Sequence, residues 1–258
     1  MTDAPANPFR FDGRVVIVTG GASGIGVGIA EVLAEAGATV VIADRQVEAA
    51  RQVAARLTAA GHGADSVALD LVDEDSVVRA CADVVARHGT PWALVNNAGI
   101  QDRELLLEGT AAEWDRMNAV NGRGAFLMTR EVARAMVAKG DGGSIVNVAT
   151  AGLVGSIVKG LVSYVGSKGA MLGLSHASAF ELSEYRITVN TVLPGGVGTP
   201  GAINAKGPPP EGPARRPLPL GKLCDPRDIG AAVAFFASPG ARMVTNQVIS
   251  VDGGFSVS

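Results

Sequence analysis

Short apolar runs alternate with longer segments of helical periodicity along most of the chain. The runs are rich in valine and isoleucine, and most are continuously apolar, which is typical of parallel strands covered on both faces. They predict strands at residues 15–18, 39–43, 66–69, 93–95, 144–148, 187–192 and 248–251. The segments between them predict helices at residues 25–35, 47–59, 74–87, 112–138, 163–184 and 227–237. This alternation with short links predicts an α/β fold, a doubly wound parallel sheet with helices on both faces.

One stretch, residues 195–220, breaks the alternation. It contains the pair Gly195-Gly196, three consecutive prolines from Pro208, and further prolines at 213, 217 and 219. Tandem prolines exclude a continuous helix or a central strand, so the stretch must run over the surface. Such segments are either stiff connectors or lids, and we expect a substrate lid. No other shift in composition divides the chain, which predicts an N-terminal tail, residues 1–10, and a single domain, residues 11–258.

Composition narrows the class of protein. With 47% apolar and 18% charged residues the chain can bury a large core, and its net charge of −3 gives no basic surface for nucleic acid. The first residues lack the pattern of a secretion signal, and no apolar stretch is long enough for a membrane-spanning helix. Cys81 and Cys224 form neither a disulfide framework nor a metal-binding cluster. We therefore expect a soluble cytoplasmic protein with no metal and with no nucleic-acid or membrane partner.

A glycine-rich turn follows the first predicted strand. Gly20, Gly24 and Gly26 let the chain turn tightly and bring backbone amides close to a phosphate, and the helix that follows adds its positive end. The next strand closes on Asp44, at the position where a carboxylate can accept hydrogen bonds from both ribose hydroxyls of a dinucleotide. The same carboxylate would repel a 2′-phosphate. The pattern therefore predicts a site for NAD in preference to NADP.

Two neighbouring residues bear on that preference. Arg45 can pair with a 2′-phosphate, which would favour NADP. The glycine turn itself has no basic residue, and Ser23 stands where one could have been. A purely structural alternative is that Asp44 caps the helix after it, and this role is compatible with ribose binding.

Tyr164 and Lys168 are four residues apart in a predicted helix and so share one of its faces. A free tyrosine has a pKa of about 10, and a nearby ammonium group favours its phenolate form. Together with the dinucleotide turn, the pair predicts proton transfer beside a nicotinamide ring. Without that turn, a core tyrosine and a solvated lysine would explain the same spacing.

Four motifs in order resemble those of the classical short-chain dehydrogenase/reductase family. They are the glycine turn at residues 19–26, Asn96-Asn97-Ala98-Gly99, Tyr164-x-x-x-Lys168 and Pro194-Gly195. The resemblance runs from about Phe11 to the end of the chain and includes residues 251–254. It implies a Rossmann-like seven-stranded sheet, a nicotinamide cofactor and a homotetramer or homodimer.

The resemblance also implies a role for each matching residue. Tyr164 would be the general acid and base, Lys168 would lower its pKa and bind the nicotinamide ribose, and Asn121 would relay protons through water. Thr150 would polarise the substrate oxygen. Asp70 would lie beside the adenine, and Thr199 would hold the nicotinamide carboxamide. The implied cofactor contacts are Gly20, Ser23, Gly24, Ile25, Gly26, Asp44, Arg45, Asp70, Leu71, Asn97, Ala98, Gly99, Tyr164, Lys168, Pro194, Gly195, Val197 and Thr199.

The chain departs from the family pattern at two positions. The family has a serine thirteen residues before its tyrosine, where this chain has Ala151. Thr150 takes the place of that serine if the alignment gap follows it, and Ser156 is the alternative. Trp92 stands where the family often has aspartate, and we expect a structural role for it.

These observations predict an NAD(H)-dependent oxidoreductase that interconverts a secondary alcohol and a ketone. Two alternatives remain open, a 3-oxoacyl-[acyl-carrier-protein] reductase and a catalytically silent NAD-binding scaffold or sensor. The expected substrate is mainly apolar with a few polar groups. That expectation rests on a pocket wall built from Leu153, Val154, Ile157 and Leu161 on the apolar side and Gln101, Asp102 and Arg103 on the polar side.

Overall fold

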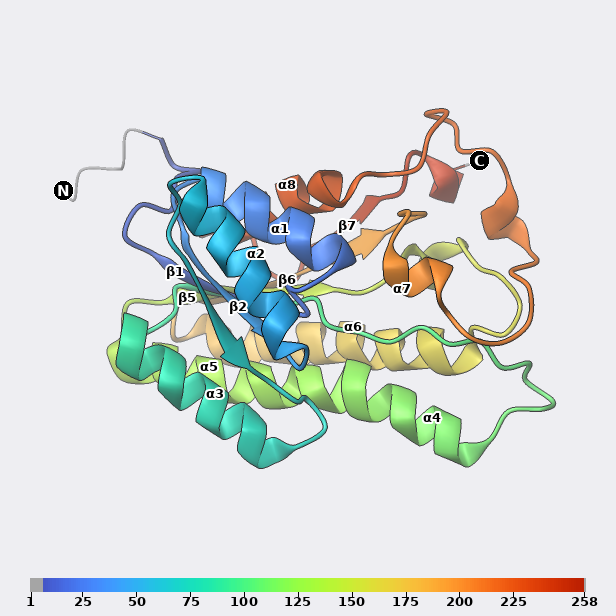
Figure 1. Cartoon of the computed structure of the whole chain (residues 1–258), viewed down its shortest axis with the longest axis horizontal. Helices are drawn as coiled ribbons and strands as arrows, with labels where there is room; N and C mark the ends of the chain where they lie inside the picture. Colours follow the sequence, from blue (N-terminus) through green and yellow to red (C-terminus); the bar gives the residue numbers. More distant parts are fainter. Residues whose placement is uncertain (1–6, 258) are drawn as a thin grey trace.

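A single parallel sheet of seven strands, in the order β3-β2-β1-β4-β5-β6-β7, forms the centre of the molecule (Figure 1). The computed structural model describes residues 7–257. The strands are β1 (Val15–Thr19), β2 (Thr39–Asp44), β3 (Ala64–Ala68), β4 (Ala93–Asn96), β5 (Gly143–Val148), β6 (Ile187–Pro194) and β7 (Val248–Val251). The predicted fold class, a Rossmann-like single domain, is confirmed.

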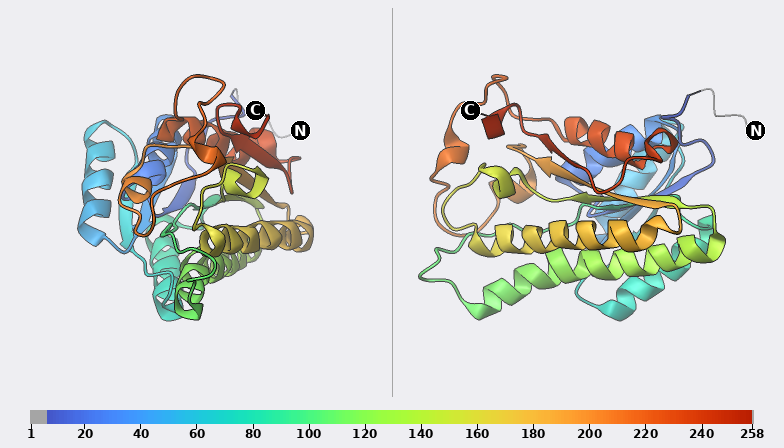
Figure 2. Two further views of the ribbon diagram at one scale, coloured as in Figure 1. Left: turned by 90° about the vertical axis from the view of Figure 1, so that its right-hand side faces the viewer. Right: turned by 180° about the vertical axis from the view of Figure 1, so that it is seen from behind.

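Helices cover both faces of the sheet (Figures 1 and 2). One face carries α1 (Gly24–Glu35), α2 (Val47–Ala59) and α8 (Pro226–Ala237). The other carries α3 (Glu74–His88), α4 (Ala111–Asn118), α5 (Gly124–Lys139) and α6 (Val162–Ser183). A short helix, α7 (Pro200–Ile203), and a 3₁₀ turn, η3 (Pro213–Arg215), lie in the proline-rich stretch. No helix in residues 7–257 has the length and apolar character needed to cross a membrane.

Alternation along β1 explains its unbroken apolar run. Val16 and Val18 face the helices α1, α2 and α8, whereas Val15 and Ile17 face the opposite layer. All four are buried. Burying one such side chain stabilises the fold by roughly 1.5–3 kcal/mol, so a strand between two helical layers gains from apolar residues at every position.

The outer strand β7 departs from this expectation. Although it is apolar, Val248 is 48% exposed and Ile249 is 40% exposed. β7 pairs with β6 on one side only, and α8 covers it on one face. An apolar run therefore predicted the strand correctly but not its burial.

The predicted helix at residues 112–138 is divided in the structure. A five-residue π-helical turn, η1 (Ala119–Arg123), separates α4 from α5. Such wide turns are found preferentially at functional sites, because the extra residue redirects side chains. Asn121 lies in the middle of η1 and is fully buried.

The predicted tail and Trp92 both contact α8 and the turn that follows it. Gly240 N–H donates to the Pro8 carbonyl at 2.8 Å, and Phe9 lies against Phe235 with ring centroids 6.3 Å apart. Trp92 donates its indole N–H to the Ala237 carbonyl at 2.8 Å. The first part of the predicted tail, residues 1–6, lies outside the described residues.

Candidate active site

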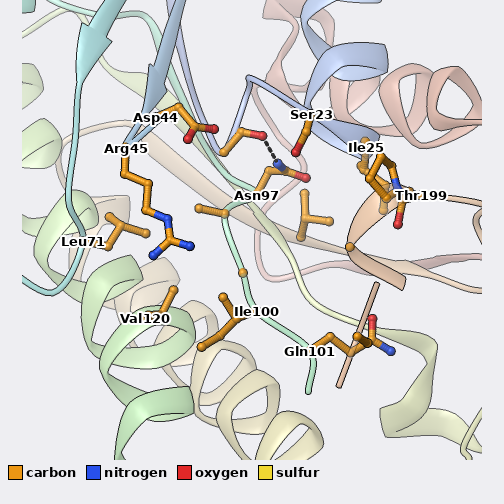
Figure 3. Close-up of a pocket in the computed structure, with 18 of the residues that line it drawn as sticks. Ser23, Ile25, Asp44, Arg45, Leu71, Asn97, Ile100, Gln101, Val120 and Thr199 are labelled. Carbon is orange, nitrogen blue, oxygen red and sulfur yellow. Dashed lines mark hydrogen bonds between the residues drawn. The ribbon is translucent and has the colours of Figure 1, made fainter. Parts of the chain in front are cut away.

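A cavity of about 670 Å³ opens at the carboxyl ends of β1, β2, β4 and β5 (Figure 3). The strand order reverses between β1 and β4, and ligands of open α/β sheets bind at such a reversal. Small-molecule sites typically have volumes of roughly 300–1,000 Å³. Most of the expected site residues line this cavity: Gly20, Ser23, Gly24, Ile25, Asp44, Arg45, Asp70, Leu71, Asn97, Ala98, Gly99, Tyr164, Lys168 and Thr199.

The glycine turn has the backbone shape of a phosphate cradle. Gly20 and Gly24 have φ of +64° and +53°, which residues with side chains rarely adopt. A Cβ atom on Gly26 would lie 2.1 Å from the Gly20 carbonyl oxygen, so only glycine fits there. Asn97 fastens the turn by donating its side-chain amide to the carbonyls of Thr19, at 3.0 Å, and Gly20, at 3.2 Å (Figure 3). The residues present therefore fit a dinucleotide.

Asp44 and Arg45 stand at the far end of the cavity from Tyr164. The Asp44 carboxylate is 8% exposed and accepts hydrogen bonds from the backbone N–H groups of Ala22 at 3.1 Å and Gln46 at 2.9 Å. Arg45 is exposed and extends along the wall towards Leu71 (Figure 3). Asp44 thus joins the glycine turn to the N-cap residue of α2, Gln46, and presents negative charge to the cavity.

Lys168 and Tyr164 lie on α6 at the other end of the cavity. Lys168 is 3% exposed, and its ammonium group donates to the Val148 carbonyl at 2.8 Å. Burial lowers the pKa of Lys168 to about 8. Burial also raises the pKa of Tyr164, and a hydrogen bond between the Tyr164 and Thr150 hydroxyls opposes this rise. The hydroxyl of Thr150 therefore favours the phenolate form of Tyr164.

The structure distinguishes Thr150 from Ser156, the two candidates to replace the family serine. Thr150 ends the segment after β5, and its side chain accepts the Gly152 N–H at 3.1 Å at the start of the 3₁₀ turn η2 (Ala151–Val154). From there its hydroxyl reaches Tyr164. Ser156 comes after η2, and its backbone N–H donates to the Ala151 carbonyl at 3.0 Å. Of the two candidates, Thr150 is therefore the one whose hydroxyl bonds to Tyr164.

Asn121 is held behind the cavity wall. Its side-chain oxygen accepts the Ile100 N–H at 2.9 Å, and its amide donates to the Ile100 carbonyl at 3.0 Å and to the Ser167 hydroxyl at 2.9 Å. A Cβ atom on Gly99 would lie 3.2 Å from the Asn121 side-chain oxygen and 3.1 Å from the Lys168 nitrogen. The absence of a side chain at Gly99 therefore keeps open the space between Asn121 and Lys168.

A buried row of polar side chains fixes α6 against the sheet. Asn96, Asn147 and Thr191 are register partners on β4, β5 and β6. Asn96 donates to the Asn147 side-chain oxygen at 2.8 Å, and Asn147 and Thr191 both donate to the Ser175 hydroxyl of α6, at 2.7 and 3.0 Å. Because Asn147 precedes Val148, the same strand holds α6 both at Ser175 and at Lys168.

The wall near Tyr164 differs from the expected one. Besides apolar residues such as Ile100 and Val120, it includes polar side chains from the loop after β4, from α4 and from the proline-rich stretch: Gln101, Asp102, Arg116, Asn204 and Lys206. Within the described residues, the wall does not include Leu153, Val154, Ile157 or Leu161. Arg116 carried no sequence signal, because it looks like any charged residue on an exposed helix and only the packing of α4 brings it to the cavity.

The remaining expected cofactor residues lie outside this wall. Gly195 N–H donates to the Val251 carbonyl at 2.9 Å, and a Cβ atom at Gly195 would lie 2.6 Å from Asp252 Cα. Val197 is 8% exposed and pairs with Cys224 in an isolated bridge. Together with Pro194, these residues join the ends of β6 and β7 at the start of the proline-rich stretch.

Comparison with known proteins agrees with this architecture. A family model described as Enoyl-(Acyl carrier protein) reductase matches residues 20–256. The chain is 36% identical over 256 residues to the sorbitol dehydrogenase of Cereibacter sphaeroides, covering 95% of this chain and 98% of that enzyme.

Solved structures are similar over nearly the whole chain. A gluconate 5-dehydrogenase from Burkholderia cenocepacia in complex with NADP and tartrate superposes with a TM-score of 0.87 at 32% identity, covering 97% of this chain and 98% of that one. A 3-ketoacyl-(acyl-carrier-protein) reductase from Brucella melitensis complexed with NADH gives a TM-score of 0.86 at 35% identity, covering 96% and 100%. The chain belongs to the classical short-chain dehydrogenase/reductase family of oxidoreductases.

Proposed function

We propose that this protein is an NAD(H)-dependent oxidoreductase that interconverts a secondary alcohol and a ketone. The observation that carries the proposal is that one cavity brings together the residues expected for proton transfer and those expected for cofactor binding. Its near end has Tyr164 bonded to Thr150 with Lys168 on the same helix, and its far end has the glycine turn and Asp44. A carboxylate at the ribose position favours NAD over NADP.

The residues divide the chemistry between them. The nicotinamide cofactor, when bound, accepts the hydride during oxidation and supplies it during reduction. Tyr164 takes the proton from the alcohol oxygen or returns it to the ketone oxygen, and Thr150 donates a hydrogen bond to the same oxygen. Lys168 contributes positive charge near the phenolate, and Asn121 connects Lys168 to solvent through water.

The cavity wall supports a polar substrate. Gln101, Asp102, Arg116, Asn204 and Lys206 offer both hydrogen-bond donors and acceptors. Asp102 and Arg116 already pair with each other at 2.6 Å, so a substrate with several hydroxyl groups besides the reacting one would bond chiefly to Gln101, Asn204 and Lys206. The activities in the names of two relatives, sorbitol dehydrogenase and gluconate 5-dehydrogenase, point to the same class.

A panel assay tests this function. We expect absorbance at 340 nm to rise when the protein is mixed with NAD⁺ and polyols or sugar acids that carry a secondary alcohol. Simple apolar alcohols should react more slowly, and NADP⁺ should be the poorer cofactor. Turnover only with 3-oxoacyl thioesters and NADPH would instead identify a 3-oxoacyl-[acyl-carrier-protein] reductase. Tight NAD binding without any turnover would identify a silent scaffold.

The cofactor preference depends on the charge of Asp44. Asp44→Asn keeps the shape and one acceptor oxygen but removes the charge that would repel a 2′-phosphate. We expect the ratio of kcat/KM for NAD⁺ to that for NADP⁺ to fall by about tenfold or more, since one charge contact of about 1.4 kcal/mol corresponds to tenfold. Asp73→Asn, an exposed helix cap outside the cavity, is the matched control and should leave the ratio unchanged. An unchanged ratio in Asp44→Asn would assign the preference to another residue.

A further inference from the structure

The proline-rich stretch is tied to the loop after β4 by a compact set of hydrogen bonds. Lys206 N–H donates to the Asp102 carboxylate at 2.9 Å, and Arg103 N–H donates to the Lys206 carbonyl at 2.8 Å. The Arg103 guanidinium donates to two further carbonyls of the stretch, those of Pro208 at 2.7 Å and Ala205 at 3.0 Å. A planar guanidinium group can donate to two carbonyls at once, whereas the ammonium group of a lysine cannot do so in the same geometry.

Gly207 lies directly against this loop. It has φ of +103°, and a Cβ atom there would lie 1.8 Å from the Arg103 carbonyl oxygen. Any side chain at this position would push the two segments apart. The close approach of the backbones therefore depends on glycine, and the hydrogen bonds on either side of it depend on the close approach.

The other side of the same loop contacts the start of α6. Glu104 N–H donates to the Gly160 carbonyl at 2.9 Å, and Glu104 forms an isolated bridge with Leu161. Leu161 is the N-cap of α6, three residues before Tyr164. The segments around 101–104, 157–161 and 200–208 meet at one end of the molecule (Figures 1 and 2). Residues 103–104 thus lie between the proline-rich stretch and the helix that carries Tyr164.

We propose that Asp102, Arg103, Lys206 and Gly207 form a clasp that holds residues 199–208 closed over the substrate end of the cavity, with Arg103 as the main positioning residue. All residues from Thr199 to Lys206 except Ile203 line the cavity, as do Gln101 and Asp102, so the clasp joins two parts of its wall. Releasing the clasp opens that wall to admit substrate or release product. Lys206 and Gly207 are at the surface, and the bonds involve one short loop, so this opening requires no change in the core.

A second anchor limits the segment that moves. Lys159 N–H donates to the Glu211 carbonyl at 2.7 Å, and Ala214 N–H donates to the Ile157 carbonyl at 3.0 Å. These bonds hold residues 211–214 independently of Arg103. Opening of the clasp should therefore free the chain around Lys206 and leave the chain around Arg215 in place.

Limited digestion with trypsin, without substrate, tests the clasp. Arg103→Met removes the guanidinium group, and Gly207→Ala prevents the backbone at residue 207 from lying against the Arg103 carbonyl. In both we expect cleavage after Lys206 to become about tenfold faster while cleavage after Arg215 keeps its rate, because local opening controls access to a protease. Gly221→Ala is the matched control, since Gly221 also has positive φ, +79°, but a Cβ there meets nothing within 4 Å. It should be cleaved at the wild-type rate.

Steady-state kinetics tests the role of the clasp in turnover, and this second test rests on the proposed function. In the clasp variants we expect KM for the alcohol to rise at least about fivefold, with a smaller change for NAD⁺, because the wall at the substrate end is lost first. Unchanged cleavage after Lys206 in both variants would overturn the clasp. Cleavage throughout the chain with a lower thermal midpoint would also overturn it, because the contacts would then support the whole domain. The digestion tests the clasp without any substrate, so its outcome stays separate from that of the proposed function.

Discussion

Tyr164→Phe is expected to abolish turnover while NAD binding survives. The substitution removes the hydroxyl oxygen of Tyr164 and keeps its aromatic ring. General acid–base catalysis typically contributes about 10²–10⁴-fold, so kcat for alcohol oxidation should fall by at least about a thousandfold. The glycine turn and Asp44 lie at the other end of the cavity, so the dissociation constant for NAD⁺, measured by calorimetry, should stay within about threefold of wild type, under 1 kcal/mol.

The chain contains its own control for this prediction. Its other tyrosine, Tyr185, is 42% exposed and lies beyond the end of α6, so Tyr185→Phe should leave kcat unchanged. Because burial raises the pKa of Tyr164, the base required for oxidation forms only as the pH rises. The oxidation rate of the wild type should therefore increase with pH, and reduction should be favoured at lower pH. Retention of more than about a tenth of kcat in Tyr164→Phe would assign the proton transfer to another group.

Thr150→Ala is the second change with a large expected effect. Its hydroxyl bonds to Tyr164 and, in the proposed function, to the substrate oxygen. Removing one donor to a developing oxyanion commonly costs about 10²–10³ in kcat, and we expect a loss in this range from steady-state kinetics. The same side chain accepts the Gly152 N–H, so the variant should also lose about 1 kcal/mol of unfolding free energy by denaturant titration.

Two further variants serve as controls for Thr150→Ala. Thr150→Ser restores the hydroxyl found in the family and should recover most of the activity. Ser156→Ala should have little effect, since Ser156 lies beyond η2, whereas the Thr150 hydroxyl bonds to Tyr164. If Ser156→Ala is the damaging change and Thr150→Ala is not, the serine of the family aligns with Ser156, and the role proposed for Thr150 is wrong.

Local patterns predicted the elements of this fold well. Valine-rich runs and the glycine turn identified the strands and the start of α1, because these signals depend on burial and backbone shape over a few residues. The π turn around Asn121 was missed, since residues 112–138 keep a helical pattern throughout and only packing reveals the extra residue. Gln101 and Asp102 were expected in the cavity wall and do line it, whereas Arg116 was missed because the sequence of α4 gives no sign of a site.

The sequence alone determined the sheet, the glycine turn, the acid at the end of β2 and the family, because each leaves a signature within a short segment. The tertiary structure decided three further points. It placed the Thr150 hydroxyl against Tyr164, put the Lys168 ammonium on the Val148 carbonyl, and joined Arg103 to the proline-rich stretch. Each of these contacts joins residues from different segments, two of them through a backbone carbonyl. Backbone carbonyls are the same in every residue, so only the folded chain shows which of them a side chain reaches.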